Sequence, residues 1–414
     1  MKKLYLIMLI VFTNILGATV ILPVLPLYAQ GTFQGTIRQI TLLASAFFGA
    51  QFLAAPWLGR LSDRFGRRPI LLISQLGTVL AFTIFIFAGK LGLAVDSLGL
   101  GLPLTGGMLM LFTGRILDGI TGGNITTAQA YVSDITNDQE RVRGLGLLQA
   151  AFGAGFVFGP ALGGILSTYG PVMPFIGATI ITAGTLTLTF FTLKESLPPE
   201  ERTGGDQPAR RSGFPLRVLL SNRTLVLMLV IGFLASMAFS SIPSTFSLYA
   251  DHVIFREEVM SSRVRLYIGL MLAFVGLMQV VTQLFFIRPL IVRFRERRVL
   301  LIGEAALSTA FFVIAGAVSP LLVTSMLGIY AFGQGVSEPT MQSLVTRFGT
   351  PRTRGHLLGL YQSARSLALI FGPILFGYMY GSISPRTVFV GGGGLMGLAF
   401  ICALILLKME FKPI

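Results

Sequence analysis

The chain has 414 residues, of which 53% are hydrophobic and only 12% are charged. The charged share is about half of that in an ordinary soluble domain, and the mean hydropathy is +0.78. Uncharged stretches of about 20 residues, the length that a helix needs to cross a bilayer, recur along the chain. This composition excludes a soluble globular protein and predicts an integral membrane protein with many helices.

The formal net charge is +15, which by itself would also suit a nucleic-acid-binding protein. However, the Lys and Arg residues fall between apolar segments and form no basic helix or aromatic-rich basic patch, so we expect no nucleic-acid partner. The single cysteine, Cys402, excludes an intrachain disulfide and any multi-cysteine metal site. We expect it to be a small core residue of the last apolar segment.

The apolar runs predict twelve membrane helices. The first run follows Lys2 and Lys3 and reaches Leu27 without a small-residue cleavage site, which indicates a retained helix rather than a signal peptide. Residues 90–106 show no helical pattern and are predicted to form a loop. The predicted helices span 4–28, 38–58, 69–89, 107–131, 144–167, 171–193, 222–249, 264–287, 299–318, 320–345, 356–379 and 387–407.

The longest polar stretch, 194–221, is rich in Pro and Gly and predicts a flexible linker. It would separate an N-terminal six-helix bundle, 1–193, from a C-terminal one, 222–414. Twelve crossings put both termini on one side of the membrane. If that side is cytoplasmic, most of the 32 Lys and Arg residues lie on it, as the positive-inside rule requires. The charged stretch 59–69 is then the cytoplasmic loop between helices 2 and 3.

The two predicted halves are related in sequence. Residues 122–164 align without a gap to residues 213 positions later, so that Gln129 meets Gln342 and the Phe-Gly-Pro triplet at 158–160 meets the one at 371–373. At a shift of 230, the arginine pair at 67–68 meets the pair at 297–298. Two similar six-helix bundles are the architecture of transporters that rock around a central site.

Several motifs carry a resemblance to a known family. "GRLSDRFGRRP", residues 59–69, resembles the signature loop of the major facilitator superfamily at every defined position, and the resemblance extends over the whole chain. "GAGFVFGPALGG", residues 153–164, resembles the helix 5 motif of its antiporter members. "GRILDGITGG", residues 114–123, is similar to a helix 4 motif linked to proton coupling, and "PVLPLY", residues 23–28, to helix 1 of tetracycline-type and multidrug exporters.

The resemblance implies the all-α major facilitator fold of two pseudo-symmetric six-helix bundles. It also implies a monomer in the bacterial inner membrane, with lipids around it, that exports hydrophobic or amphipathic compounds in exchange for protons by alternating access. A lipid or lysolipid flippase, a proton-coupled nutrient transporter and a non-transporting sensor of the same fold are the alternatives. The sequence has no phosphate-cradling loop, metal-ligand cluster or nucleophile–base constellation, so we expect no ATP, metal, cofactor or enzymatic activity.

The charged stretch and one later acid predict a cytoplasmic gate. Arg67 can make a forked, charge-assisted bond to a carboxylate, and Asp134, at the end of helix 4, is its expected partner. Gly59 and Gly66 allow a tight turn where backbone must approach another helix. By the resemblance, this cluster latches the two halves and favours the outward-open state; alternatively, its arginines only set the topology. The predicted gate residues are Gly59, Asp63, Arg64, Gly66, Arg67, Arg68 and Asp134.

The repeat predicts that this latch is one-sided. Asp63 aligns with Arg293, and Asp134 aligns with Arg347. The second half therefore loses both acids at the aligned positions, and we expect the latch to draw its acids from the first half only.

Charges within helices are rare here, and each costs at least about 2.5–3.5 kcal/mol near the bilayer centre. Arg115 and Asp118, three residues apart on one face of helix 4, are close enough to pair. Glu338 directly precedes Pro339 in helix 10. A proton-coupled carrier needs such a carboxylate beside a cation, which makes Asp118, Arg115 and Glu338 the predicted proton-coupling residues. Alternatively, Asp118 only neutralises Arg115, and Glu338 only bonds to the broken helix.

Two further charges have other interpretations. Arg365, in helix 11, can pair with Glu338, bind an anionic substrate group or snorkel to the cytoplasmic face, and snorkelling is the favoured interpretation. Glu304, near the start of helix 9, is expected at the membrane interface.

Helices 1, 4, 7 and 10 line a central cavity in the superfamily. Many tetracycline-like relatives carry an acid in helix 1 where this chain has Asn14, which argues against recognition of a cationic drug through that helix. Any single Phe can equally face lipid. The predicted cavity residues are Asn14, Tyr28, Asn124, Gln129, Phe239, Phe246, Gln334, Gln342 and Arg365. The small residues of helix 5 allow close packing or bending, and their surface can also seal against a leak; they are Gly155, Gly159, Pro160, Gly163 and Gly164.

Overall fold

The computed structural model describes residues 2–99, 101, 103–122, 125–198, 200, 202, 222–256, 261–347 and 354–409. These residues form helices and no strand, which confirms the predicted all-α class. They divide into two compact units, Met1–Gln207 with Glu257–Ala273, and Pro208–Arg256 with Phe274–Ile414. Most of the predicted linker lies outside the described residues, and the predicted boundaries 1–193, 194–221 and 222–414 stay a prediction.

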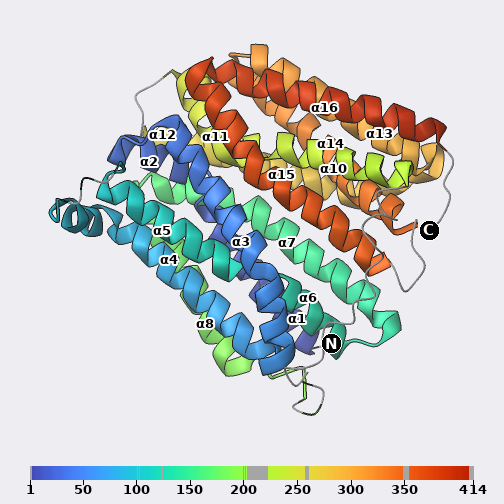
Figure 1. Cartoon of the computed structure of the whole chain (residues 1–414), viewed down its shortest axis with the longest axis horizontal. Helices are drawn as coiled ribbons and strands as arrows, with labels where there is room; N and C mark the ends of the chain where they lie inside the picture. The colour runs from blue at the N-terminus through green and yellow to red at the C-terminus, as the bar shows by residue number, and fades with distance from the viewer. Residues whose placement is uncertain are drawn as a thin grey trace. The chain divides into compact units, whose positions relative to one another are not determined.

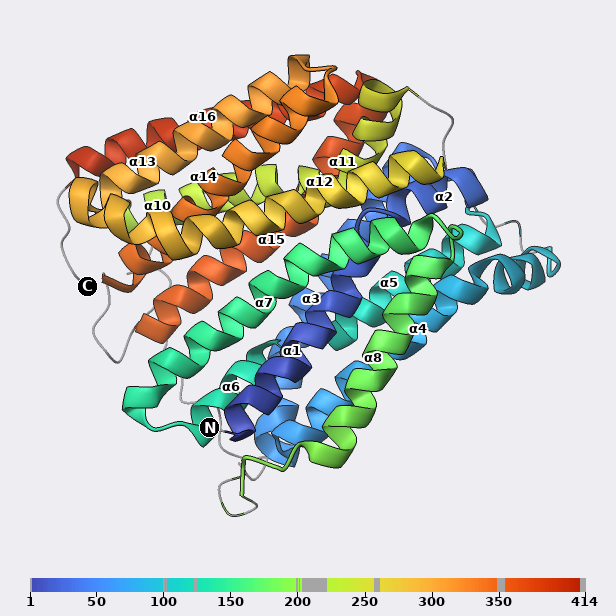
Figure 2. The ribbon, with the colours of Figure 1, turned by 180° about the vertical axis from the view of Figure 1, so that it is seen from behind.

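The first unit follows the predicted helices, except that predicted helices 1 and 4 each correspond to two helices. Pro23 and Pro26 accompany a break between the first two helices, because proline removes a helical donor. Two contact faces organise the unit: α1 packs along α7 and α8, and α4 packs against α5 and α8 (Figures 1 and 2). The helices are α1 (Lys2–Val20), α2 (Leu25–Phe33), α3 (Ile37–Phe65), α4 (Arg67–Asp96), α5 (Gly106–Thr121), α6 (Ile125–Ile135), α7 (Asp138–Ser167), α8 (Met173–Thr192) and the start of α12 (Ser262–Val281).

The loop predicted at 90–106 is wrong for its first seven residues, because α4 continues to Asp96. The Asp96 carboxylate accepts a hydrogen bond of 2.7 Å from the backbone N–H of Gly106, at the start of α5. Gly92 also packs closely: a Cβ there would lie 2.6 Å from the Cα of Gly107. The glycines that hid the helical pattern are thus the residues that let α4 and α5 approach each other.

The second unit is also helical, with two π-helical turns, η3 (Ala250–Phe255) and η4 (Thr282–Phe286). α13 bends at Arg295, which has φ 63° and separates predicted helices 8 and 9. Beyond the bend, α13 packs between α14 and α16 (Figures 1 and 2). The α-helices are α10 (Arg223–Phe239), α11 (Ser241–Tyr249), the end of α12, α13 (Ile287–Gly316), α14 (Pro320–Arg347), α15 (Arg354–Ser382) and α16 (Pro385–Lys408).

Among the described residues, eight helical stretches are long and apolar enough to cross a membrane by length and composition. One of them, Ser262–Gly316, joins predicted helices 8 and 9. Predicted helices 4, 10 and 11 lie outside these eight stretches, in α5–α6, α14 and α15. Two of them carry the charged side chains Asp118 and Glu338.

Candidate functional site

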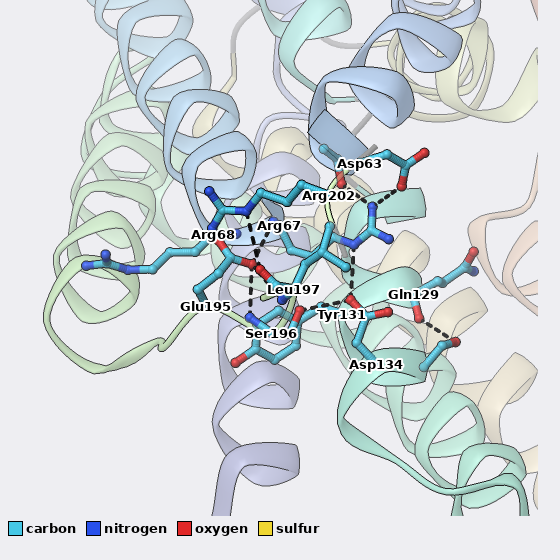
Figure 3. A network of polar contacts seen from close by, with 12 residues as sticks. Asp63, Arg67, Arg68, Gln129, Tyr131, Asp134, Glu195, Ser196, Leu197 and Arg202 are labelled. Atoms are coloured by element: carbon cyan, nitrogen blue, oxygen red, sulfur yellow. Dashed lines mark hydrogen bonds and ion pairs between the residues drawn. The ribbon is translucent and has the colours of Figure 1, made fainter. Parts of the chain in front are cut away.

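Arg67, the first residue of α4, connects two acids of the first unit. Its Nε donates to Asp134 Oδ2 at 3.1 Å, and its Nη1 pairs with Asp63 and donates to Ser62 Oγ at 2.8 Å. Ser196 Oγ donates a further hydrogen bond of 2.9 Å to the same oxygen of Asp134 (Figure 3). The predicted pairing of Arg67 with Asp134 is confirmed, and it ties the start of α4 to the end of α6.

A third acid, Glu195, completes this network and was missed by the sequence analysis. Its carboxylate accepts hydrogen bonds from the backbone N–H groups of Arg67 at 2.9 Å and Arg68 at 3.1 Å, which caps the N-terminus of α4 (Figure 3). An acid in this position also suits the positive end of the helix dipole. Tyr131 donates its hydroxyl to the carbonyl of Lys194 at 2.8 Å, so the first residues of the predicted linker pack on the first unit.

The two glycines of the signature loop differ in role. Gly66 has φ 103°, and a Cβ there would lie 2.7 Å from the carboxyl carbon of Glu195. Gly66 therefore serves the predicted turn and close approach. The same prediction is wrong for Gly59, which lies inside α3 and whose added Cβ would meet nothing within 4 Å.

The other two arginines of the predicted gate, Arg64 and Arg68, each lie close to an aromatic ring. Arg68 donates to the carbonyl of Phe190 at 2.7 Å, and its guanidinium lies 5.7 Å from the centre of that ring. Arg64 is exposed and lies 5.2 Å from the ring centre of Phe65.

The predicted pair in helix 4 is present and deeply buried. Arg115 Nη1 lies 3.2 Å from Asp118 Oδ2, and the two side chains are 8% and 5% exposed. The Arg115 guanidinium also stacks on Phe47, 4.1 Å from the ring centre, and its Nε donates to the carbonyl of Leu43 at 3.5 Å. This pair balances its own charge within the first unit.

The second unit holds a more exposed pair. Arg365 pairs with Glu338, and its Nε donates to Ser236 Oγ at 3.0 Å. Gln342 donates to Glu338 Oε1 at 2.6 Å, and the Tyr361 hydroxyl donates to Oε2 at 3.5 Å. The favoured prediction that Arg365 snorkels to the cytoplasmic face is therefore wrong, because the acid on α14 holds it.

Glu304 was expected at the membrane interface, but its side chain is buried inside the second unit. It is 1% exposed, within α13. Its polar neighbours are Ser337 and Glu338 of α14, and its Oε2 accepts no hydrogen bond from the described residues. The sequence placed this acid near the predicted start of helix 9 at 299, but it did not indicate that Ser337 and Glu338 of α14 lie against the side chain.

The second unit has an acid of its own next to the bend of α13. Arg347 Nη2 lies 2.7 Å from Glu296 Oε1, and Ser343 donates to the same oxygen at 3.0 Å. The second half therefore keeps an acid at this place, while the origin of the acids in the latch stays a prediction. Arg347 occupies the position aligned with Asp134. Glu296 directly precedes Arg297, the residue aligned with Arg67. The second unit thus has an ion pair at the corresponding place, with the acid and the base exchanged.

The glycines of the helix 5 motif pack against α1. An added Cβ would lie 2.6 Å from Ile15 at Gly155, 2.7 Å from Thr19 at Gly159 and 2.9 Å from the Val20 carbonyl carbon at Gly163. Thr19 also donates to the carbonyl of Gly155 at 2.9 Å. Small residues at this spacing let the helices approach closely.

The last glycine of the motif packs against the start of α12. An added Cβ on Gly164 would lie 3.0 Å from the Cα of Gly269, and one on Gly269 would lie 2.6 Å from the carbonyl oxygen of Pro160. Nearby, the buried Arg265 donates to the carbonyl of Ser167, the last residue of α7, at 2.8 Å. Arg265 is the second residue of the predicted helix 264–287, and nothing near it in the sequence indicated this contact with α7.

Comparison with known proteins places this geometry in a family. The family model described as "Major Facilitator Superfamily" matches residues 7–262 and 256–413. The chain belongs to the Major Facilitator Superfamily. The two matches together cover almost the whole chain, which agrees with the fold and with the signature loop around Arg67.

The relatives are transporters and resistance proteins. The chain is 30% identical over 404 residues to "Tetracycline resistance protein, class B" of Escherichia coli, covering 97% of this chain and 94% of the relative. It is 28% identical over 400 residues to "Multidrug resistance protein 2" of Bacillus subtilis, covering 94% and 91%. The crystal structure of the nucleoside transporter NupG has a TM-score of 0.75 at 14% identity, covering 99% of this chain and 100% of that one, and this likeness shows the fold. The protein is thus an integral membrane protein of a transporter family.

The predicted cavity residues lie in different surroundings, some buried and some exposed. Tyr28 and Phe246 are buried in the cores of their units; the Tyr28 ring lies 5.0 Å from that of Phe175. Gln129 is exposed, and Gln334 donates to Tyr330 at 3.5 Å. Asn14 lines a small pocket of the first unit, Phe239 is partly exposed, Gln342 and Arg365 contact Glu338, and Asn124 lies outside the described residues. For Tyr28 and Phe246, packing in the core accounts for the aromatic side chain.

Proposed function

We propose that this protein is a secondary active transporter that exports hydrophobic or amphipathic compounds, of the tetracycline and multidrug type, in exchange for protons. The full-length similarity to tetracycline resistance proteins carries this proposal. The buried carboxylates, Asp118 beside Arg115 and Glu338 beside Arg365, support it, because a coupled carrier needs an acid whose protonation changes during the cycle. The host membrane is the bacterial inner membrane, with both termini cytoplasmic and the protein a monomer.

Drug accumulation in bacteria that lack their own efflux pumps tests this function. Cells that express the protein should accumulate less tetracycline and less cationic dye, and a protonophore should abolish the difference. Asp118→Asn and Glu338→Gln should abolish it as well, at equal amounts of protein in the membrane. Unchanged accumulation over a broad panel of compounds, with the protein present in the membrane, would refute drug export.

The cytoplasmic network is proposed to act as a latch in the transport cycle. Arg67 contacts Asp63 and Asp134 at the junction of three helices, so a change at one helix end reaches the others. Arg67→Ala and Asp63→Ala should abolish export without loss of membrane insertion. Full export by Asp63→Ala would contradict the latch.

A further inference from the structure

Glu304 is a deeply buried carboxylate of the second unit, and among the described residues no cation forms an ion pair with it. It is 1% exposed, and its Oε2 accepts no hydrogen bond from the described residues. Burying an ionised carboxylate without a partner costs so much that the group takes up a proton instead. The neutral acid would also become a hydrogen-bond donor. Ser337 Oγ lies beside it and is buried without another hydrogen-bond partner among the described residues.

Among the residues that the structure describes, the groups around Glu304 offer no unpaired cation to compensate its charge. From α14, Ser337 and the acid Glu338 act on it, and α15 contributes Tyr361 and Arg365 to the same cluster. The guanidinium of Arg365 is already paired with Glu338. The other elements that pack against α13 are η4, which has no charged residue, and α16, which has none between Arg386 and Lys408.

The cluster thus counts two acids against one cation. Glu338 is paired with Arg365 and also receives hydrogen bonds from Gln342 at 2.6 Å and from Tyr361 at 3.5 Å, which compensate its charge. Glu304 has none of these donors. We propose that Glu304 is a proton-binding site of the second unit, holding one proton as a neutral carboxylic acid while Glu338 stays ionised against Arg365.

This proposal deepens the proposed proton-coupled export and rests on it for its role in transport. A proton from water adds to one oxygen of Glu304, and no other bond changes. If helix movements during the cycle draw Arg365 away from Glu338 or bring water to Glu304, the proton can leave. Glu304 would then carry the transported proton, with Glu338 setting its affinity.

Infrared difference spectroscopy on the purified full-length protein tests the site without requiring transport. We expect a carbonyl band of a protonated carboxylic acid at neutral pH that disappears in Glu304→Gln. It should persist in Glu296→Gln, a matched substitution on the same helix at an acid that Arg347 already pairs. Glu304→Asp, which keeps a titratable group, should retain a shifted band. A wild-type protein without the band, or a band that Glu304→Gln leaves intact, overturns the proposal.

Transport in proteoliposomes then separates this site from the proposed function. Glu304→Gln should keep substrate counterflow, which needs no net proton movement, and lose accumulation driven by a pH gradient. Gradient-driven accumulation that survives in Glu304→Gln contradicts the proposal even if the export function is correct. If wild-type protein transports none of the compounds, the export function fails while the infrared band still decides the proton site. A band that added sodium removes at constant pH would assign the site to an alkali cation instead and overturn the proposal.

Discussion

The two halves of this protein bury charge in different ways. In the first unit, Arg115 and Asp118 form a pair with both side chains less than 10% exposed. In the second unit, Arg365 and Glu338 are 21% and 25% exposed, and the buried Glu304 beside them adds a negative charge. A balanced pair is a stable structural arrangement, whereas an excess acid must bind something positive. The comparison supports a proton held by Glu304 in the second half, whereas in the first half a proton would have to separate Asp118 from Arg115.

The halves also differ in the ion pairs at the start of α4 and at the bend of α13. The first unit gathers three acids, Asp63, Asp134 and Glu195, around the start of α4. The second uses one acid, Glu296, against Arg347. Related sequences have thus kept an ion pair at the same place in the fold while exchanging the side that supplies the acid.

The largest effect should come from breaking the balanced pair. Asp118→Asn leaves Arg115 charged and without its carboxylate in a buried site, which should lower the free energy of unfolding by about 3–5 kcal/mol. Arg115→Gln with Asp118→Asn removes both charges and should recover most of that loss. Denaturant unfolding in mixed micelles measures both variants. A single variant as stable as the wild type would mean that Asp118 is already neutral, and the contrast between the halves would disappear.

The second pair should be less sensitive. In Arg365→Gln, Glu338 keeps the donors Gln342 and Tyr361, so the loss should be about 1–3 kcal/mol. The same unfolding measurement applies, with Arg365→Lys as the control that retains the charge. A loss as large as that of Asp118→Asn would show that the second half depends on its ion pair as strongly as the first.

The signature loop offers a matched test of backbone strain. Gly66→Ala places a Cβ at φ 103° and against Glu195, which should cost about 1–3 kcal/mol. Gly59→Ala, seven residues earlier in the same motif, lies inside α3 with open space and should be neutral or stabilising by up to about 1 kcal/mol. Equal losses in both variants would mean that the cap by Glu195 does not constrain the junction.

The sequence was sufficient for the parts of the structure that depend on local pattern. Apolar run length predicted the helices, and spacing on one helix face predicted that Arg115 and Asp118 would pair. Contacts between helices were harder to predict. Glu195 follows α8, and nothing near it in the sequence indicates that it caps α4.

The alignment of the repeat was informative about position and misleading about charge. Arg347 was correctly aligned with Asp134, but the acid Glu296 stands one residue away from the aligned arginine pair and escaped a position-by-position comparison. The burial of Glu304 could not be predicted from hydropathy, because its neighbours Ser337 and Glu338 come from α14, far away in the sequence.

The smallest difference in the free energy of unfolding should be that between the Arg67–Asp134 pair and the Glu296–Arg347 pair. Asp134→Asn removes the acceptor of Arg67 and Ser196, and should cost about 1–3 kcal/mol because hydrogen bonds to a charged group are lost. Glu296→Gln should cost about 1 kcal/mol or less, because the Arg347 side chain is 63% exposed and water can replace its partner.

Salt sharpens this last contrast. Ions screen the Glu296–Arg347 pair, whose arginine is 63% exposed, more than the Arg67–Asp134 pair, whose side chains are 11% and 22% exposed. The effect of Glu296→Gln should therefore shrink more at high ionic strength than that of Asp134→Asn. Unfolding measured at low and high salt gives both numbers. If the two variants respond alike, the exchanged pair of the second half is as firmly built as the network around Arg67, and a latch that draws on both halves becomes the better description.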